Sequence, residues 1–253
     1  MGSFIKTIEQ LQKTSGAKTV FFDAEVLSIM WETDPAIIAK ILPNGMTPAV
    51  RPVVWAFIAN YPRTSFCPPY KEAGLFISAV KDEAEGFYCL SMPITDGQAM
   101  AMGREIMGLP KKMADIQLSI KEDKLNGSIS RNGIKFFEVD AELAPAIDTK
   151  SGNANIFHIK YSKAADGNGF DMMPVLYANE LACDNRVMRP ATVSMKFTDS
   201  PHDPWAELTP TKIISAVYTV GDNTLMDGVK LGMIDPMTFA PYSYTRWDWW
   251  LEE

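Results

Sequence analysis

The feature that most constrains the fold is a long series of strand-like segments separated by turn signals. Residues 19–32 and 51–61 are rich in aromatic and β-branched side chains, which favour strands. Residues 70–80 and 86–94 are two more such segments, joined by a polar turn at 82–86. Short polar connections of this kind are typical of antiparallel neighbours. The first part of the chain therefore predicts an antiparallel sheet.

The second half of the chain continues this pattern. Residues 114–121, 125–131 and 134–142 predict a three-stranded meander, in which the Asn-Gly pairs at 126–127 and 132–133 are turn signals. Three later segments are also predicted to be strands: 154–161, 188–198 and 206–219.

Helices are predicted to be few and peripheral. Apolar residues on one face of 3–13 predict a short docking helix. The Asp-Pro pair at 34–35 predicts the start of a helix that ends near residue 42, and residues 95–107 predict another. The polar, Gly-rich stretch 163–186 predicts a loop or lid. The aromatic tail at 237–250 predicts a segment that seals the core or a subunit interface, with a pocket wall as the alternative.

Together these segments predict an α+β protein that is mostly antiparallel β. The chain has no evident domain linker, low-complexity segment or internal repeat, so we expect residues 1–253 to form a single domain. A sheet of many strands can close into a β-barrel or cone with peripheral helices. A closed barrel of this kind would enclose a central cavity.

Composition excludes several classes of function. The net charge is −7 and no basic run is present, so we expect no nucleic-acid partner. The apolar runs fall well short of the ~18 residues that a membrane helix needs, and no apolar signal core precedes the first strand. Cys67, Cys89 and Cys183 lack metal-like spacing, and His158 and His202 are far apart, so no metal site is expected. A reduced, cytoplasmic location fits best.

Lys111 and Lys112 follow a Gly-Leu-Pro break and are flanked by Met107, Leu109 and Met113. A solvated lysine has a pKa of about 10.4, so only about 1 in 2500 is a free amine at pH 7. An amine that attacks a ketone must be neutral, and both desolvation and a neighbouring cation favour that state. The alternative is a solvated surface pair, which is the usual state of adjacent lysines.

The geometry of the lysine pair decides which of the two causes can operate. If residues 110–114 are extended, Lys111 and Lys112 point to opposite faces, and only one of them can line a cavity. The neighbouring cation acts best when both ammonium groups share the pocket, whereas desolvation needs only one lysine inside. We expect desolvation to contribute more, because apolar residues flank the pair.

The chain resembles the acetoacetate decarboxylase family through motifs in the same order over roughly residues 20–220. The most specific of these is Gly-Arg-Glu, four variable residues and Pro-Lys-Lys, which spans Gly103 to Lys112. The weaker matches are Thr33-Asp34 with Pro43, Tyr70-Lys71-Glu72, Arg189-Pro190 and Glu207.

The resemblance implies a β-cone and a lysine Schiff-base mechanism without a metal or organic cofactor. It implies that Lys111 is the imine-forming lysine, that Lys112 modulates it, and that Glu72 is an active-site carboxylate. The implied partner is a small-molecule keto acid or ketone, and a homo-oligomer is expected. The implied reaction is the decarboxylation of a β-keto acid through a protonated imine and an enamine.

Several family positions differ here and point to another substrate. Alignment on Thr33-Asp34 places Ala24 and Ala56 where the family has an arginine and an acidic residue, so we expect a larger, more apolar pocket. Arg189 is a candidate substitute for the substrate carboxylate's partner, with a structural arginine at a strand start as the alternative. Leu109 and Met92 complete the candidate substrate-binding residues.

Two alternatives to the decarboxylase stay open. The same enamine supports an aldolase, dehydratase or cyclase of this family. A different class, a β-barrel that binds an apolar ligand without chemistry, would suit the 15 methionines and the loss of pocket charge. The presence of Lys111, Lys112 and Glu72 argues against a passive binder, which needs no buried amine.

Overall fold

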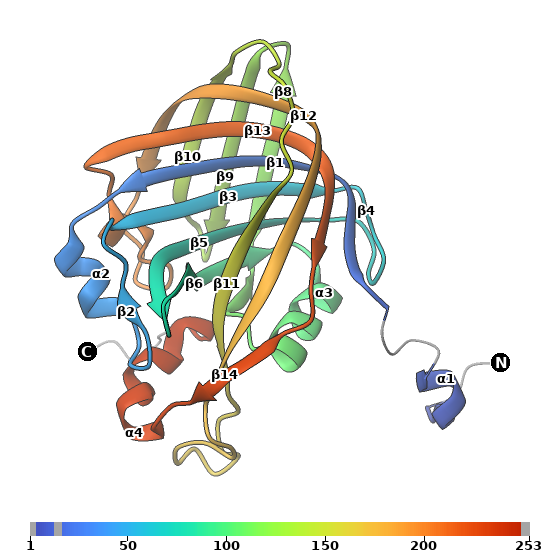
Figure 1. Ribbon diagram of the computed structural model, residues 1–253, viewed down its shortest axis with the longest axis vertical. Coiled ribbons are helices and arrows are strands. Elements are labelled where there is room, and N and C mark those ends of the chain that lie inside the picture. The colour runs from blue at the N-terminus through green and yellow to red at the C-terminus, as the bar shows by residue number, and fades with distance from the viewer. Residues whose placement is uncertain (1–3, 13–16, 249–253) are drawn as a thin grey trace.

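Seven strands close into a barrel in the computed structural model, which describes residues 4–12 and 17–248. Around the barrel they are β11 (Gly152–Lys160), β6 (Ala84–Ile94), β5 (Tyr70–Lys81), β3 (Val53–Tyr61), β1 (Thr19–Glu32), β13 (Lys212–Leu225) and β12 (Val175–Phe197). Pairing of β11 with β12 closes the circle (Figure 1). Neighbours in the barrel are antiparallel except β6 and β11, which are parallel. The predicted closed, mostly antiparallel barrel is confirmed.

The longest strand, β12, joins the barrel to the rest of the sheet. Its first half pairs with β11 and its second half with β10 (Ile134–Leu143). The sheet then continues through β9 (Lys124–Arg131) to β8 (Asp115–Lys121), which is the predicted meander. The loop predicted at 163–186 is wrong in its second part, because β12 begins at Val175. Its polar residues misled the prediction, since some of them face the barrel interior.

One turn in the meander lies four residues before the Asn-Gly pair at 126–127 that predicted it. The chain reverses at Glu122, which has a φ of 58°, and Asn126 and Gly127 are inside β9. A Cβ on Gly127 would lie 2.8 Å from Cδ1 of Ile58 on β3. Gly127 therefore allows β9 and β3 to lie close together. From the sequence alone, a glycine needed for close packing looks the same as a glycine in a turn.

Several short strands and helices lie outside the seven barrel strands. The short strands are β2 (Thr47–Pro48), β4 (Arg63–Thr64), β7 (Lys111–Met113) and β14 (Val229–Met233). The α-helices are α1 (Ile8–Gln12), α2 (Pro35–Ile41), α3 (Gly97–Met102) and α4 (Pro236–Phe239). A π-helical turn (Gly103–Met107) follows α3, and 3-10 turns occur at Trp205–Leu208 and Ala240–Arg246. Within the described ranges, no helix is long and apolar enough to cross a membrane.

Two of the helix predictions can be compared directly with the structure. Asp34 caps α2, because its side chain accepts a hydrogen bond from the Ala36 amide at 2.8 Å. The predicted docking helix is shorter than expected and lies apart from the barrel (Figure 1), with Phe4, Ile5, Ile8 and Leu11 all exposed. Docking of this helix onto its own chain is therefore not seen.

The aromatic tail packs partly against the core, as predicted for a sealing segment. Phe239 and Arg246 are buried, whereas Met237 and Trp247 are exposed. Trp249 and Trp250, which belong to the predicted segment, lie outside the described residues.

The barrel wall is covered by apolar side chains on both faces, and these form two separate clusters. One lies between the wall and the β8–β10 extension and includes Trp31, Ile58 and Phe137. The other lies inside the barrel and includes Trp55 and Phe57. A strand buried on both faces reads as one continuous apolar run, which explains the pattern of residues 51–61.

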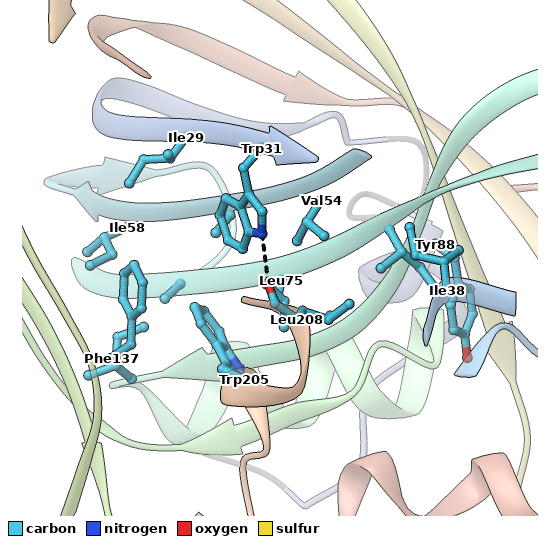
Figure 2. Packing of buried hydrophobic residues seen from close by; sticks show 14 of the residues in the cluster. Ile29, Trp31, Ile38, Val54, Ile58, Leu75, Tyr88, Phe137, Trp205 and Leu208 are labelled. Atoms are coloured by element: carbon cyan, nitrogen blue, oxygen red, sulfur yellow. Dashed lines mark hydrogen bonds between the residues drawn. The ribbon is translucent and has the colours of Figure 1, made fainter. Parts of the chain in front are cut away.

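Trp31 is central to the outer cluster (Figure 2). Its indole is fully buried, and Nε1–H donates to the Leu208 carbonyl at 2.7 Å. This bond ties β1 to the 3-10 turn after the loop at residues 198–204.

We predict that Trp31→Phe lowers the free energy of unfolding by about 2–4 kcal/mol, because it leaves the Leu208 carbonyl unpaired and a void in the core. Chemical denaturation measures the change. Val50→Ala is the control, since Val50 is 97% exposed and its loss should have little effect. Equal stabilities of the two variants would contradict the packing described here.

Candidate active site

The lysine pair lies on β7, a three-residue strand that runs parallel to the end of β6. Lys111 is paired with Met92 and Lys112 with Pro93. Because the segment is extended, the two side chains leave it on opposite faces, as its sequence predicted for an extended strand. Lys111 lines the cavity inside the barrel, and Lys112 lines a second cavity on the other side of the sheet.

Two glycines before β7 shape the approach of Lys111. A Cβ on Gly103 would collide with Cδ and Cε of Lys111, so the glycine provides the groove in which the lysine lies. Gly108 ends the π-helical turn with a φ of 83°, a conformation that favours glycine. A Cβ there would also meet the backbone of Lys160 on β11. Gly103, the first residue of the Gly-Arg-Glu motif, thus has a steric role in addition to its place in that motif.

Arg246, from the tail, holds the turn before the lysines against β11. Its guanidinium is buried and donates to the carbonyls of Gly108, Ile159 and Tyr161. Burial lowers the pKa of this arginine. Sequence reasoning missed it, because a contact between residues 108 and 246 leaves no local signal.

Lys111 and Glu72 form a buried ion pair inside the barrel. Lys111 is 5% exposed and Glu72 on β5 is 4% exposed, and the lysine Nζ donates to Glu72 Oε2. The ring of Tyr70, two residues before Glu72 on the same face of β5, lies 5.9 Å from Nζ. The fold therefore brings the amine of the Pro-Lys-Lys block and the carboxylate of the Tyr-x-Glu motif into direct contact.

The pair borders an apolar cavity of about 510 Å³. Leu109 and Met92, two of the candidate substrate-binding residues, line it. Most of the remaining lining is aromatic or aliphatic, and includes Phe21, Val26, Met30, Trp55, Phe57, Tyr61, Phe76, Ile106 and Met107. In such surroundings an ion pair is only weakly screened by solvent.

Three predicted substrate-binding residues do not line this cavity. Ala56 alternates with Trp55 and Phe57 on β3, so it faces the outer cluster instead. Arg189 lies on β12, and its guanidinium donates to Asp123 Oδ1 at 2.6 Å and to nearby carbonyls. These bonds give Arg189 a structural position, although it lies in the middle of β12 and not at the start of a strand.

Ala24 is the third of these residues. It belongs to the inner apolar cluster but does not line the cavity. A break in the pairing of β1 between Phe21 and Ala24, with Asp23 at a φ of 54°, changes the direction of the strand here. An alignment by motif spacing does not account for such a bulge.

Lys112 takes part in a different charge network. Its Nζ lies 2.9 Å from Asp203 Oδ1 and 3.4 Å from Asp248 Oδ1, and Arg131 binds the second oxygen of both carboxylates at 2.6 and 2.9 Å. Burial would raise the pKa of Asp248, but the hydrogen bonds from Arg131 and Asn132 hold it well below its usual range. Lys112 is therefore outside the cavity that Lys111 lines, and two carboxylates balance its charge.

A buried histidine was missed by the sequence reasoning. His158 on β11 lines the cavity, and its Nε2 is bonded to Asn179 Oδ1, whose amide in turn donates to the Met226 carbonyl at 2.6 Å. Burial lowers the pKa of His158 to about 4, so the ring is neutral at pH 7. The only signal was a polar residue within the apolar run 156–159.

The described part of the chain contains no cluster of metal-ligating side chains. Among residues 4–12 and 17–248, no group of three or more His, Cys, Asp or Glu side chains could hold a metal ion.

Comparison with known proteins identifies the family. The model of the acetoacetate decarboxylase (ADC) family matches residues 9–232. The chain belongs to the acetoacetate decarboxylase family. A "CLA biosynthesis isomerase" of Lactiplantibacillus plantarum is 26% identical over 98% of this chain and 95% of its own length. An acetoacetate decarboxylase of Burkholderia cenocepacia (strain HI2424) is 28% identical over 81% of this chain and 85% of its own length.

Solved structures support the same fold. The acetoacetate decarboxylase of Legionella pneumophila superposes with a TM-score of 0.80 at 22% identity, and the match covers 92% of this chain and 98% of that one. An isomerase and a decarboxylase are thus similar to this chain at nearly equal sequence identity. Sequence similarity therefore does not distinguish between their reactions.

The burial of His158 predicts a pH dependence of stability. The ring titrates near pH 4 when folded and near 6.5 when unfolded, so the unfolded state binds more protons between these values. We expect the free energy of unfolding to fall by up to about 3 kcal/mol as pH drops from 6.5 to 4. Denaturation at several pH values measures this, and His158→Gln should remove it. An equal pH slope in both proteins would contradict the assignment.

The network around Lys112 predicts a structural rather than chemical role. Lys112→Met leaves buried Asp203 with Arg131 as its remaining ionic partner, and loss of one member of a buried pair costs about 3–5 kcal/mol. Thermal and chemical unfolding measure the loss. Adding Asp203→Asn should restore part of it, because the uncompensated charge is then removed. A single variant as stable as the wild type would show that the network contributes nothing.

Proposed function

We propose that this member of the acetoacetate decarboxylase family is a Schiff-base enzyme in which Lys111 forms an imine with a ketone-bearing small molecule. The observation that carries the proposal is the buried Lys111–Glu72 pair at the wall of an apolar cavity of about 510 Å³. A passive binder of an apolar ligand has no use for a buried amine, and an isolated ion pair in such a wall is costly to keep.

The first steps follow from the contact between the two groups. Glu72 takes a proton from the Lys111 ammonium, and the free amine attacks the ketone carbon. The carbonyl electron pair moves to oxygen, which takes from Glu72 the proton removed from the ammonium. Glu72 then takes a second proton from the attached nitrogen and passes it to the oxygen, which leaves as water. The product is a protonated imine, whose cationic C=N group accepts electrons from the neighbouring carbon.

The reaction that we place first is decarboxylation of a β-keto acid. The bond between the α carbon and the carboxylate breaks, its electron pair forms the enamine, and carbon dioxide leaves. The α carbon is then protonated, and water hydrolyses the imine to release the ketone and free Lys111. The protonated imine formed on Lys111 is the electron sink for the loss of carbon dioxide.

The cavity favours a substrate larger and more apolar than acetoacetate. Its volume lies within the range of about 300–1,000 Å³ that suits ligands of drug size. Trp55, Phe57 and Phe76 contribute extended aromatic surface to the cavity wall. A β-keto acid with a long or branched apolar part would bury that part against these rings.

A second candidate is migration of a carbon–carbon double bond in an unsaturated ketone. It is favoured by the similarity to an isomerase over almost the whole chain. After the imine forms, a proton leaves the α carbon and another is added at the γ carbon, so the double bond shifts without loss of carbon dioxide. Glu72 is the group beside Lys111 that can carry this proton. Aldol cleavage, dehydration and cyclisation would use the same enamine.

We predict that borohydride added during incubation with apolar β-keto acids traps an adduct on Lys111. Lys111→Met with Glu72→Gln should abolish both adduct and turnover, because the nucleophile is gone and the buried carboxylate is removed with it. Intact mass, peptide mapping and carbon dioxide release are measured. Lys121→Met is the matched control, since Lys121 is exposed on β8 and should leave all three unchanged.

The products separate the two candidates. Carbon dioxide released from a β-keto acid supports the decarboxylase. An adduct on Lys111 without carbon dioxide, together with a shifted double bond in an unsaturated ketone, supports the isomerase. No adduct with any ketone would reject the Schiff-base proposal and favour a binding protein.

A further inference from the structure

Tyr70, which lines the cavity, carries a buried hydroxyl without a partner among the described residues. Tyr70 is 4% exposed, and among the described residues its Oη has no hydrogen-bond partner. Buried polar groups are nearly always paired, and an unpaired one reduces stability. Such a group at the wall of a ligand cavity is therefore a candidate for binding the ligand.

Packing and strand geometry place the ring of Tyr70 near the Lys111 amine. Tyr70 and Glu72 are two residues apart on β5 and face the same cavity. The Lys111 Nζ lies 5.9 Å from the centre of the Tyr70 ring. The ring of Tyr61 packs edge-on against that of Tyr70 at 5.1 Å and so fixes its orientation.

The hydroxyl keeps its proton under physiological conditions. Burial, and then the charge of Glu72, raise the pKa of Tyr70 far above that of a solvated tyrosine. The group can therefore donate a hydrogen bond but does not act as a base. The other near neighbour of Lys111, Glu72, already accepts the lysine's hydrogen bond.

We propose that the Tyr70 hydroxyl donates a hydrogen bond to the substrate's carbonyl oxygen during imine formation. This rests on the proposed function. As Lys111 Nζ bonds to the carbonyl carbon, the C=O electron pair moves to oxygen, and the Tyr70 O–H stabilises the developing negative charge. The oxygen then receives protons passed through Glu72 and leaves as water, while Tyr70 retains its own proton. The same bond acts in reverse when water hydrolyses the final imine.

The test compares two tyrosine variants by the rate of borohydride trapping of a ketone. Tyr70→Phe removes the unpaired hydroxyl, so we expect trapping on Lys111 to slow by about 10²-fold, as for loss of one oxyanion donor. Its melting temperature should be unchanged or higher, because no hydrogen bond within the described chain is lost. Tyr161→Phe is the matched control: its hydroxyl donates to the Ser243 carbonyl outside the cavity. It should melt at a lower temperature and trap at the wild-type rate.

A second measurement reads the hydrogen bond without chemistry. In a Lys111→Met background, the infrared C=O stretch of a bound ¹³C-labelled ketone should move to higher frequency when Tyr70→Phe is added. An unchanged frequency, or wild-type trapping by Tyr70→Phe, would overturn the role of Tyr70 while leaving the lysine chemistry intact. Absence of an adduct in the wild type would instead reject the proposed function, and this inference with it.

Discussion

The ion pair between Lys111 and Glu72 is the interaction on which the rest of the site depends. Two opposite charges in an apolar wall are stable only if their geometry is good and their remaining contacts are favourable. The closed barrel supplies that setting, because it removes sheet edges and surrounds the pair with aromatic side chains. In the proposed mechanism, this contact lets a proton pass directly between the amine and the carboxylate.

The alternation of side chains along short strands separates the two lysines. Lys111 enters the cavity, and Lys112 enters a network with Asp203, Asp248 and Arg131 on the other face. The network ties β7 to the loop before Trp205 and to the C-terminal segment, so it can hold the strand in register. A charge that two carboxylates already balance has little net field at Lys111. Lys112 therefore does not act as an uncompensated cation beside Lys111.

Much of the fold could be predicted because its signals are local. Strands from Thr19 to Ile94 and the meander after residue 114 follow from β-branched and aromatic runs and from polar turns. The features that depend on long-range contacts could not be predicted. The parallel pairing of β6 with β11 and the strand character of residues 175–186 depend on closure of the barrel, which no short segment encodes.

The same distinction holds for the site. Lys111 and Glu72 were found because each lies in a motif, although their contact spans 39 residues of sequence. Ala56 and Arg189 were misplaced because the face of a strand is inverted by a one-residue change in register. His158, Arg246 and the unpaired hydroxyl of Tyr70 became visible only once distant strands were brought together.

A crystal structure of the borohydride-reduced complex with an apolar ketone would test the central claim most directly. The account predicts continuous density from Lys111 Nζ into the cavity, with Glu72 hydrogen-bonded to the new secondary amine and the apolar chain against Trp55 and Phe57. An adduct on Lys112 or on a surface lysine, with Lys111 unmodified, would contradict it.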